Sequence, residues 1–265
     1  MKKSLFILIS FVTSFSVFAD TRGLSSDPKA RNTALLVSSS HGLPGLEYDI
    51  SNVSEMALTT GSGFSVEKVV NGKATVATIA SELTKLADSS DAAATHLFYF
   101  TGHGGRGTIL AEDRAMKIDE IRKALLQGRE SWGPMARLTF IVDSCHSGSL
   151  IDPMRSLKPM GVLESSEVLG QEMVDEIVDA LSPKRDESPL YHSLLAFVSA
   201  RADETCLAGS KGSAFTVALK NAWNKAVEQK WTVKQLIDET GKGTKGSHPT
   251  ARLVPAQIAD EVLVP

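Results

Sequence analysis

Two short segments of the chain contain side chains that could react together. His103 lies in the segment TGHGGRG, in which four of the seven residues are glycine, and Cys145 follows 42 residues later in the segment DSCHSGS. A thiol is a weak nucleophile until it ionises, and a neighbouring imidazole can stabilise the thiolate and later protonate a leaving amine. Glycines beside the histidine let a substrate approach the backbone, where N–H groups can stabilise an oxyanion. Together these parts predict acyl transfer through a thioester.

Each segment directly follows a run of apolar residues, which is typical of a buried strand. The two runs are LFYF at 97–100 and LTFIV at 138–142. Further strands are predicted at 34–37, 64–70 and 194–198, and helices at 52–60, 76–86, 118–126, 168–181, 215–226 and from 232 onward. The sequence therefore alternates between strands and helices.

Strands that alternate with helices and are apolar on both faces predict a parallel sheet with helices on both sides. We therefore expect a three-layer α/β/α sandwich with a mostly parallel sheet of about six strands. Ligands of such sheets bind beyond the carboxyl ends of the strands. If the strands at 97–100 and 138–142 are neighbours, His103 and Cys145 face each other across that cleft.

Composition excludes several classes of protein. The chain has 265 residues, of which 42% are hydrophobic and 22% charged, so it can bury a core and is not globally disordered. Its net charge of −3 argues against a nucleic-acid binder, which usually has an excess of basic residues. Two cysteines are too few for a disulfide framework or a four-cysteine zinc site. They leave one disulfide, inert thiols or a reactive thiol.

The first nineteen residues have the pattern of a secretory signal peptide. Lys2 and Lys3 precede an apolar stretch that ends in Val17-Phe18-Ala19, with small residues at the positions that a cut after Ala19 requires. The stretch is shorter than the roughly 20 residues of a spanning helix, so a membrane anchor is the weaker alternative. Cleavage would leave 26 basic and 31 acidic residues, a net charge of −5. We expect an exported protein, periplasmic or secreted, with no membrane segment in its mature form.

The domain organisation follows from these observations. We expect a signal peptide at 1–19, a flexible lead-in at 20–33 and a single domain at 34–265. Within that domain, the segment 150–192 is long for a connection between two strands, and connections of this length usually have a function or contain their own secondary structure.

The two motifs also resemble a known family. FYFTGHGG and FIVDSCHSGS are similar to segments of metacaspases and their bacterial caspase-like relatives, and the resemblance extends from about Ala34 to Trp223. It implies a caspase–hemoglobinase fold and cysteine endopeptidase activity on a protein or peptide substrate. By the same resemblance, His103 is the general acid/base, Cys145 is the nucleophile, and the N–H groups of Gly104 and Cys145 form the oxyanion hole. Calcium activates some relatives and is a possible activator here, although the sequence contains no recognisable calcium loop.

The resemblance further implies cleavage after arginine or lysine. Metacaspases place an acidic residue of the basic-side-chain pocket two residues before the nucleophile, where this chain has Asp143. Asp203, after the strand at 194–198, is a second candidate, with Arg201 in the same loop. A buried carboxylate suits an arginine side chain because charge-assisted bidentate hydrogen bonds are strong. The alternatives are that Asp143 only caps a loop and that Asp203 is solvated.

The long segment 150–192 contains a candidate site of self-cleavage. In caspase-like proteins this region is where processing occurs, and Lys184 and Arg185 would suit an enzyme that cuts after basic residues. The alternative is that both lie in an ordinary solvated loop.

Other interpretations compete with a reactive thiol. Cys145 could form a disulfide with Cys206, which would abolish its nucleophilicity or act as a redox gate, and the chain could be an inactive binding protein with a caspase fold. The glycines around His103 also match G-x-G-x-x-G, but the residues after them lack the period of a helix that a dinucleotide site requires. A metal site formed by Cys145, His146, His103 and His41 lacks the H-x-x-x-H or C-x-x-C spacing that would support it. His41 is more typical of a surface residue, although it follows a strand.

Overall fold

The computed structural model describes residues 31–59, 64–88, 91, 93–105, 107–131, 133–145, 177–182, 190–200, 208–254 and 260. Within this part of the chain, the main path of the central sheet has six strands in the order β10-β7-β6-β3-β1-β2. Their bounds are β1 Thr33–Ser39, β2 Ser65–Val70, β3 Thr95–Gly105, β6 Met135–Cys145, β7 Tyr191–Val198 and β10 Thr250–Val254. All neighbouring pairs on this path are parallel except β10 with β7. The predicted mostly parallel sheet is therefore confirmed.

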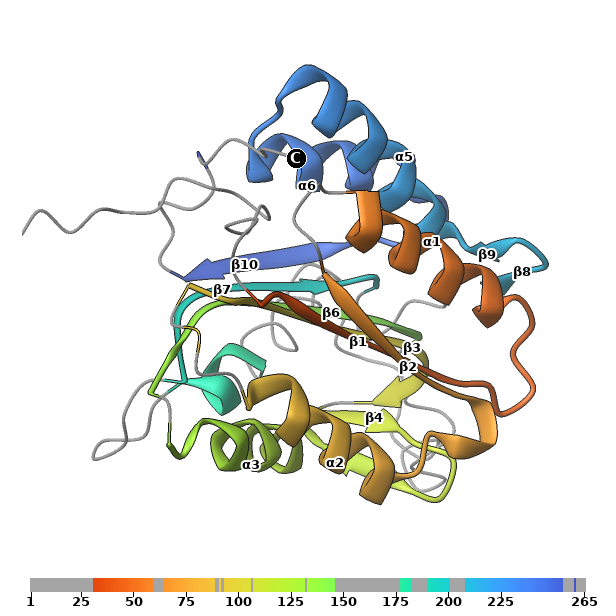
Figure 1. Ribbon diagram of the computed structural model, residues 1–265. Helices are drawn as coiled ribbons and strands as arrows, with labels where there is room; N and C mark the ends of the chain where they lie inside the picture. The colour runs from red at the N-terminus through yellow and green to blue at the C-terminus, as the bar shows by residue number, and fades with distance from the viewer. Residues whose placement is uncertain are drawn as a thin grey trace, which may run out of the picture.

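Helices cover both faces of this sheet, as Figure 1 shows. One face carries α1 (Leu46–Thr59), α5 (Ala214–Gln229) and α6 (Val233–Gly243), and the opposite face carries α2 (Val76–Ala87) and α3 (Ile118–Arg129). Each face has its own apolar core, because alternate residues of the buried strands point to opposite sides. Leu35 and Phe98 belong to the core under α2 and α3, whereas Leu36 and Tyr99 belong to the core under α1 and α5. The three-layer α/β/α sandwich is thus confirmed.

Several boundaries differ from the predicted ones. Helix α1 begins at Leu46, six residues before the predicted start at residue 52, because Leu46, Ile50, Val53 and Ala57 already form one buried face. Strand β1 begins at Thr33, the last residue of the predicted lead-in. The short strand β10 was not predicted, since its polar residues hide an apolar pattern. In the predicted helix 168–181, the structure describes residues 177–181, which are helical.

Strand β3 continues through the glycine-rich segment instead of ending before it. It extends to Gly105, and the chain then forms a hairpin of β4 (Thr108–Leu110) and β5 (Ala115–Lys117). Strand β4 pairs back onto β3 through Gly104 and Gly105. A dinucleotide site would need a helix directly after the glycines. The hairpin in its place argues against that interpretation.

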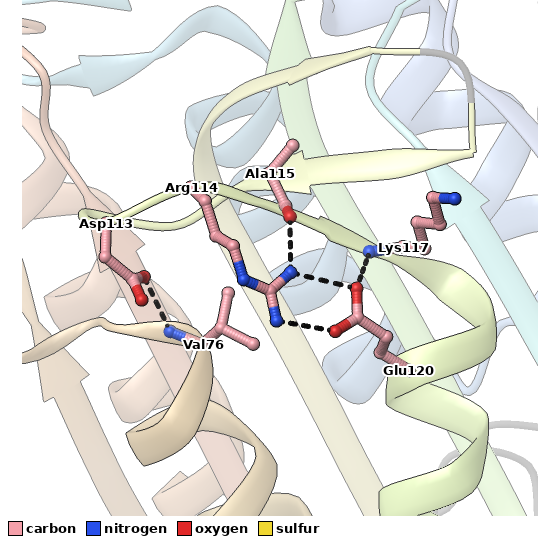
Figure 2. Close-up of polar contacts among 6 residues, drawn as sticks. All are labelled: Val76, Asp113, Arg114, Ala115, Lys117 and Glu120. Carbon is pink, nitrogen blue, oxygen red and sulfur yellow. Dashed lines mark hydrogen bonds and ion pairs between the residues drawn. The ribbon is translucent and has the colours of Figure 1, made fainter.

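Residues in the turn between β4 and β5 form hydrogen bonds to helices α2 and α3 (Figure 2). Asp113 accepts a hydrogen bond of 2.8 Å from the backbone N–H of Val76, the first residue of α2. Arg114 donates to both carboxylate oxygens of Glu120 in α3, and Glu120 also accepts from the backbone N–H of Lys117 at 3.0 Å. Carboxylates at these positions satisfy N–H groups that a helix start leaves free. Helices α2 and α3 therefore hold the turn between β4 and β5 in place.

The C-terminal part begins as the sequence predicts. Thr232 and Gln235 form a capping box at the start of α6, with hydrogen bonds of 3.2 and 2.8 Å. The first three residues of the glycine-rich segment 241–246 complete α6. Two minor elements lie earlier in the chain than α6. They are the 3-10 turn η1 (Asn71–Lys73) and the hairpin of β8 (Ala208–Gly209) with β9 (Gly212–Ser213). Among the described residues, no helix has the length and apolar character needed to cross a membrane.

Candidate active site

The register of β3 and β6 brings the two predicted reactive residues together. These strands are parallel neighbours, and His103 and Cys145 are direct Cα partners at the carboxyl ends of both strands. The alignment is maintained along the strands, because Phe98 opposite Phe140 and Phe100 opposite Val142 all belong to one buried core. The predicted proximity of His103 and Cys145 therefore arises from strand pairing that the core of the sheet stabilises.

The glycines around His103 allow this backbone to pack closely. Gly102 has φ of +152°, and a Cβ atom there would lie 2.5 Å from the carbonyl oxygen of Ser39 in β1. A Cβ atom on Gly104 would lie 2.6 Å from Oγ of Ser144 and 3.2 Å from the carbonyl oxygen of Thr108. These distances are too short for any side chain larger than hydrogen. The glycines thus hold His103 between β1, β6 and the β4 hairpin.

The side chain of His103 is half-buried, and a second histidine lies beside it. The ring centroids of His41 and His103 are 6.4 Å apart. Nε2 of His41 donates to the carbonyl oxygen of Ala111 at 3.0 Å, so the exposed His41 ring is held at the cleft. Nδ1 of His103 is buried and has no hydrogen-bond partner among the described residues. His41 was expected to be a surface residue; it is exposed, and its ring lies beside that of His103.

Burial lowers the pKa of His103, and the nearby His41 lowers it further. Both effects disfavour the imidazolium, because burial removes hydration and a second positive charge repels the first. The imidazole of His103 is consequently neutral near pH 7. A neutral imidazole can accept a proton from a thiol, as a general base requires.

Asp143 lies in β6, two residues before Cys145, and its side chain is 3% exposed. Its Oδ2 accepts hydrogen bonds from the hydroxyl of Ser213, from that of Thr216 at 2.7 Å and from that of Tyr99 at 3.4 Å. The hydroxyl of Ser199, in the segment directly after β7, is a further donor to Asp143. Burial raises the pKa of this carboxyl group, and the hydrogen bonds oppose that effect.

A second buried carboxylate, which the sequence did not predict, lies next to Asp143. Asp49 of α1 is fully buried and accepts hydrogen bonds from the backbone N–H of Ser213 at 2.7 Å and from the hydroxyl of Thr101 at 3.1 Å. Burial, together with the negative charge of Asp143, raises its pKa to about 7. One sequence signal could have found it, because Asp49 interrupts the apolar face that Leu46 and Val53 form on the same helix.

Asp143 is one of the residues that line a small pocket at the same sheet edge as His103. The cavity has a volume of about 10 Å³, roughly the room of one water molecule, and its walls are formed by Leu43, Leu46, Thr101, Gly102, Asp143, Ala208 and Ser213. Gly102 immediately precedes His103, so the pocket adjoins the histidine and the Cys145 position. Among the described residues, every hydrogen-bond donor to Asp49 and Asp143 is neutral. We call it the acidic pocket because Asp143 is one of its walls.

Comparison with known proteins decides the family. The sequence model described as "Caspase domain" matches residues 31–247 of this chain. The chain belongs to this caspase-domain family. Caspase-family membership supports a cysteine-peptidase type of hydrolase acting on protein substrates, and it matches the resemblance seen in the two motifs. The match extends beyond Trp223 and includes all of α6.

Solved structures show the same fold as this caspase-domain chain. A protein from Geobacter sulfurreducens has 18% sequence identity and a TM-score of 0.60, over 84% of this chain and 93% of that one. Caspase-1 from Spodoptera frugiperda has 15% identity and a TM-score of 0.58, over 91% of each chain. The search of curated protein sequences found no match. The similarity to the two solved structures supports the caspase-like α/β/α architecture.

Several predicted residues lie outside the described part of this caspase-domain chain. They are the signal peptide 1–19, Lys184, Arg185, Asp203 and Cys206. The position of Cys145 comes from its backbone pairing with His103. Within the described ranges, no group of three or more histidine, cysteine, aspartate or glutamate residues could hold a metal ion.

Proposed function

We propose that this chain is an exported cysteine endopeptidase that cleaves peptide bonds after arginine or lysine. The observation that carries the proposal is the Cα pairing of His103 with Cys145 at the carboxyl edge of the sheet. This pairing unites the two residue types that form a thiol nucleophile and its acid/base partner. Caspase-domain membership supports the same reaction class.

The reaction follows from the roles of these two residues. His103 accepts the thiol proton of Cys145, and the thiolate attacks the carbonyl carbon of the scissile bond. In this proposal the N–H groups of Gly104 and Cys145 stabilise the oxyanion of the tetrahedral intermediate. His103 then protonates the leaving amine, and a thioester remains on Cys145. Water, deprotonated by His103, hydrolyses the thioester and releases the carboxylic acid.

The acidic pocket supports the choice of a basic side chain. Asp49 and Asp143 are buried beside the reactive pair, and their described partners are neutral hydroxyl and N–H groups. Buried carboxylates are costly unless a positive charge compensates them. A guanidinium or ammonium group from the residue before the scissile bond would supply that charge. An aspartate side chain would instead add a further negative charge, so we expect it to be rejected.

Peptidase assays of the mature chain test the proposal. Residues 20–265 are incubated with fluorogenic peptides that end in arginine, lysine or aspartate, with and without reductant and calcium. We expect cleavage after arginine and lysine that Cys145→Ala abolishes and Cys206→Ala leaves intact. If no condition gives cleavage that depends on Cys145, the peptidase proposal is wrong and a binding protein with a caspase fold remains. Cleavage only after aspartate would overturn the basic specificity.

Two further experiments test self-cleavage and the redox state of Cys145 and Cys206. Mass spectrometry of the incubated protein detects self-cleavage, which the double variant Lys184→Gln/Arg185→Gln should prevent if these residues are the site. A disulfide between Cys145 and Cys206 would make activity depend on reductant, and Cys206→Ala would remove that dependence. Export is tested separately by N-terminal sequencing of the secreted or periplasmic protein, which we expect to begin at Asp20.

A further inference from the structure

Asp143 of the pocket wall and Asp49 of α1 form one hydrogen-bonded unit. Ser213 connects them, because its backbone N–H donates to Oδ1 of Asp49 and its hydroxyl donates to Oδ2 of Asp143. Thr101 donates to Oδ2 of Asp49 and is itself the Cα partner of Asp143 across β3 and β6. Four elements (α1, β3, β6 and β9) thus hold the two carboxylates in a fixed relationship.

The surroundings of this unit provide no compensating positive charge within the described residues. Helix α1 contributes Glu47, whose negative charge also acts on Asp49. Strand β3 contributes Tyr99, a buried phenol whose pKa is raised well above its usual value and which therefore stays neutral. Strand β9 and helix α5 contribute the hydroxyls of Ser213 and Thr216.

Two buried carboxylates in such surroundings cannot both ionise without a large cost. Burial removes the hydration of each anion, and the second charge repels the first. Coupled carboxyl pairs therefore lose their protons in two separate steps that belong to the pair. The unit that Ser213 connects has the geometry for this behaviour, and its members Asp143, Ser213 and Thr101 line the pocket where a cationic side chain is proposed to bind.

We propose that Asp49 and Asp143 hold one proton between them while the pocket is empty and release it when a guanidinium or ammonium group binds. This inference rests on the proposed basic specificity of the same pocket. Binding of a cation supplies the positive charge that the buried pair lacks, so both carboxylates ionise and the proton passes to solvent. Substrate recognition is thereby linked to pH through the pocket, separately from the titration of His103.

The proposed linkage predicts both the direction and the size of the effect of pH on ligand binding. Above pH 7 the proton is already absent, and cationic ligands bind at full strength. With a pKa of about 7 for Asp49, lowering the pH from 8 to 6 weakens binding about tenfold. Ligands with a neutral side chain do not displace the shared proton, so their affinity should not depend on pH in this range.

Calorimetry on the full mature chain with Cys145→Ala measures this linkage without turnover. Acetyl-Ala-Arg-amide is titrated at pH 7 in buffers of different ionisation enthalpy, and the slope against that enthalpy gives the number of protons released. We expect about half a proton at pH 7 and nearly one at pH 6. The matched control ligand is the citrulline analogue, which has the same shape without the charge and should release none.

Two variants in the same background sharpen the test. Asp49→Asn keeps the shape of the unit but removes the shared proton, so the residual arginine affinity should not change between pH 6 and 8. Asp238→Asn, an exposed position on α6, should behave like the parent protein. Urea unfolding of each variant establishes that it is folded. The parent protein alone still decides the question if Asp49→Asn is unstable.

The outcomes separate this inference from the peptidase proposal. Arginine binding with proton release but no turnover in the wild-type chain would support the inference and refute the peptidase. Cleavage after arginine together with pH-independent binding and no proton release would overturn the inference and leave the peptidase standing. Failure of the arginine ligand to bind at pH 8 would overturn the inference as well.

Discussion

His103 and Cys145 are direct partners in the parallel register of β3 and β6, 42 residues apart in the chain. Two positions earlier in the same register, Thr101 faces Asp143. The reactive pair and the acidic pocket therefore lie on the same two strands, and the backbone pairing that aligns one also aligns the other. A change in the register would disrupt the reactive pair and the pocket together.

The neighbouring histidine should determine where activity falls at low pH. In His41→Phe the repulsion that helps to lower the pKa of His103 is lost, so that pKa rises. Because the neutral imidazole is the active base, the acidic limb of kcat at saturating substrate should move to higher pH; kcat reports groups in the enzyme–substrate complex. The exposed His192→Gln is the control and should leave the profile unchanged. An unaltered acidic limb in His41→Phe would mean that His41 has no electrostatic effect on His103.

Gly102 should tolerate no side chain. In Gly102→Ala the new Cβ meets the carbonyl oxygen of Ser39, and the residue has φ of +152°, so we expect a loss of about 1–3 kcal/mol in the free energy of unfolding. Gly72→Ala is the matched control, since nothing lies within 4 Å of its Cβ, and its effect should stay within about 0.5 kcal/mol. Urea denaturation measures both. Equal stability of the two variants would show that the β1–β3 contact can relax without cost.

Two helical glycines should respond in opposite directions to alanine. At Gly128 in α3, a Cβ would lie 2.2 Å from the carbonyl oxygen of Thr84 in α2, so Gly128→Ala should push the two helices apart and destabilise the protein. At Gly241 in α6 nothing lies within 4 Å, so Gly241→Ala should stabilise by about 0.5–1 kcal/mol through helix propensity alone. Thermal unfolding compares the two variants. Stabilisation of both would refute close packing of α2 on α3.

Replacement of two buried threonines of the sheet by valine should change the stability of the protein in opposite directions. The hydroxyl of Thr139 is buried and has no hydrogen-bond partner among the described residues, so Thr139→Val should stabilise the protein by about 1 kcal/mol. The hydroxyl of Thr101 donates to Asp49, so Thr101→Val should destabilise it by a similar amount, about 1 kcal/mol. Both changes keep the shape of the side chain, and chemical denaturation gives the difference. A destabilising Thr139→Val would indicate that its hydroxyl has a partner after all.

Much of the fold was predictable because it depends on local patterns. The apolar runs that precede the segments of His103 and Cys145 indicate buried strands by themselves, and the capping residues Thr232 and Gln235 define the start of α6. Strand β10 was missed because Arg252 and Thr250 break its short apolar pattern, and its strand conformation depends on pairing with β7.

The candidate site likewise contains residues that were predicted from the sequence and residues that were not. His103 and Cys145 were predicted from their residue types and from their place at strand ends, and Asp143 from the resemblance to metacaspases. Asp49 and His41 were not assigned to the site, since each comes from a different region of the chain and reaches the site only through packing of α1 and of the loop after β1. Their chemistry depends on neighbours that are distant in sequence.

The sequence by itself determined the alternation of strands and helices, the two reactive residues and the family they indicate, because each of these is encoded in a few consecutive residues. Only the tertiary structure decided the register that pairs His103 with Cys145 and the meeting of Asp49 with Asp143. The physical reason is that burial and Coulomb repulsion depend on distance in space. Two carboxyl groups 94 positions apart become a single titrating unit only when α1 packs against the sheet.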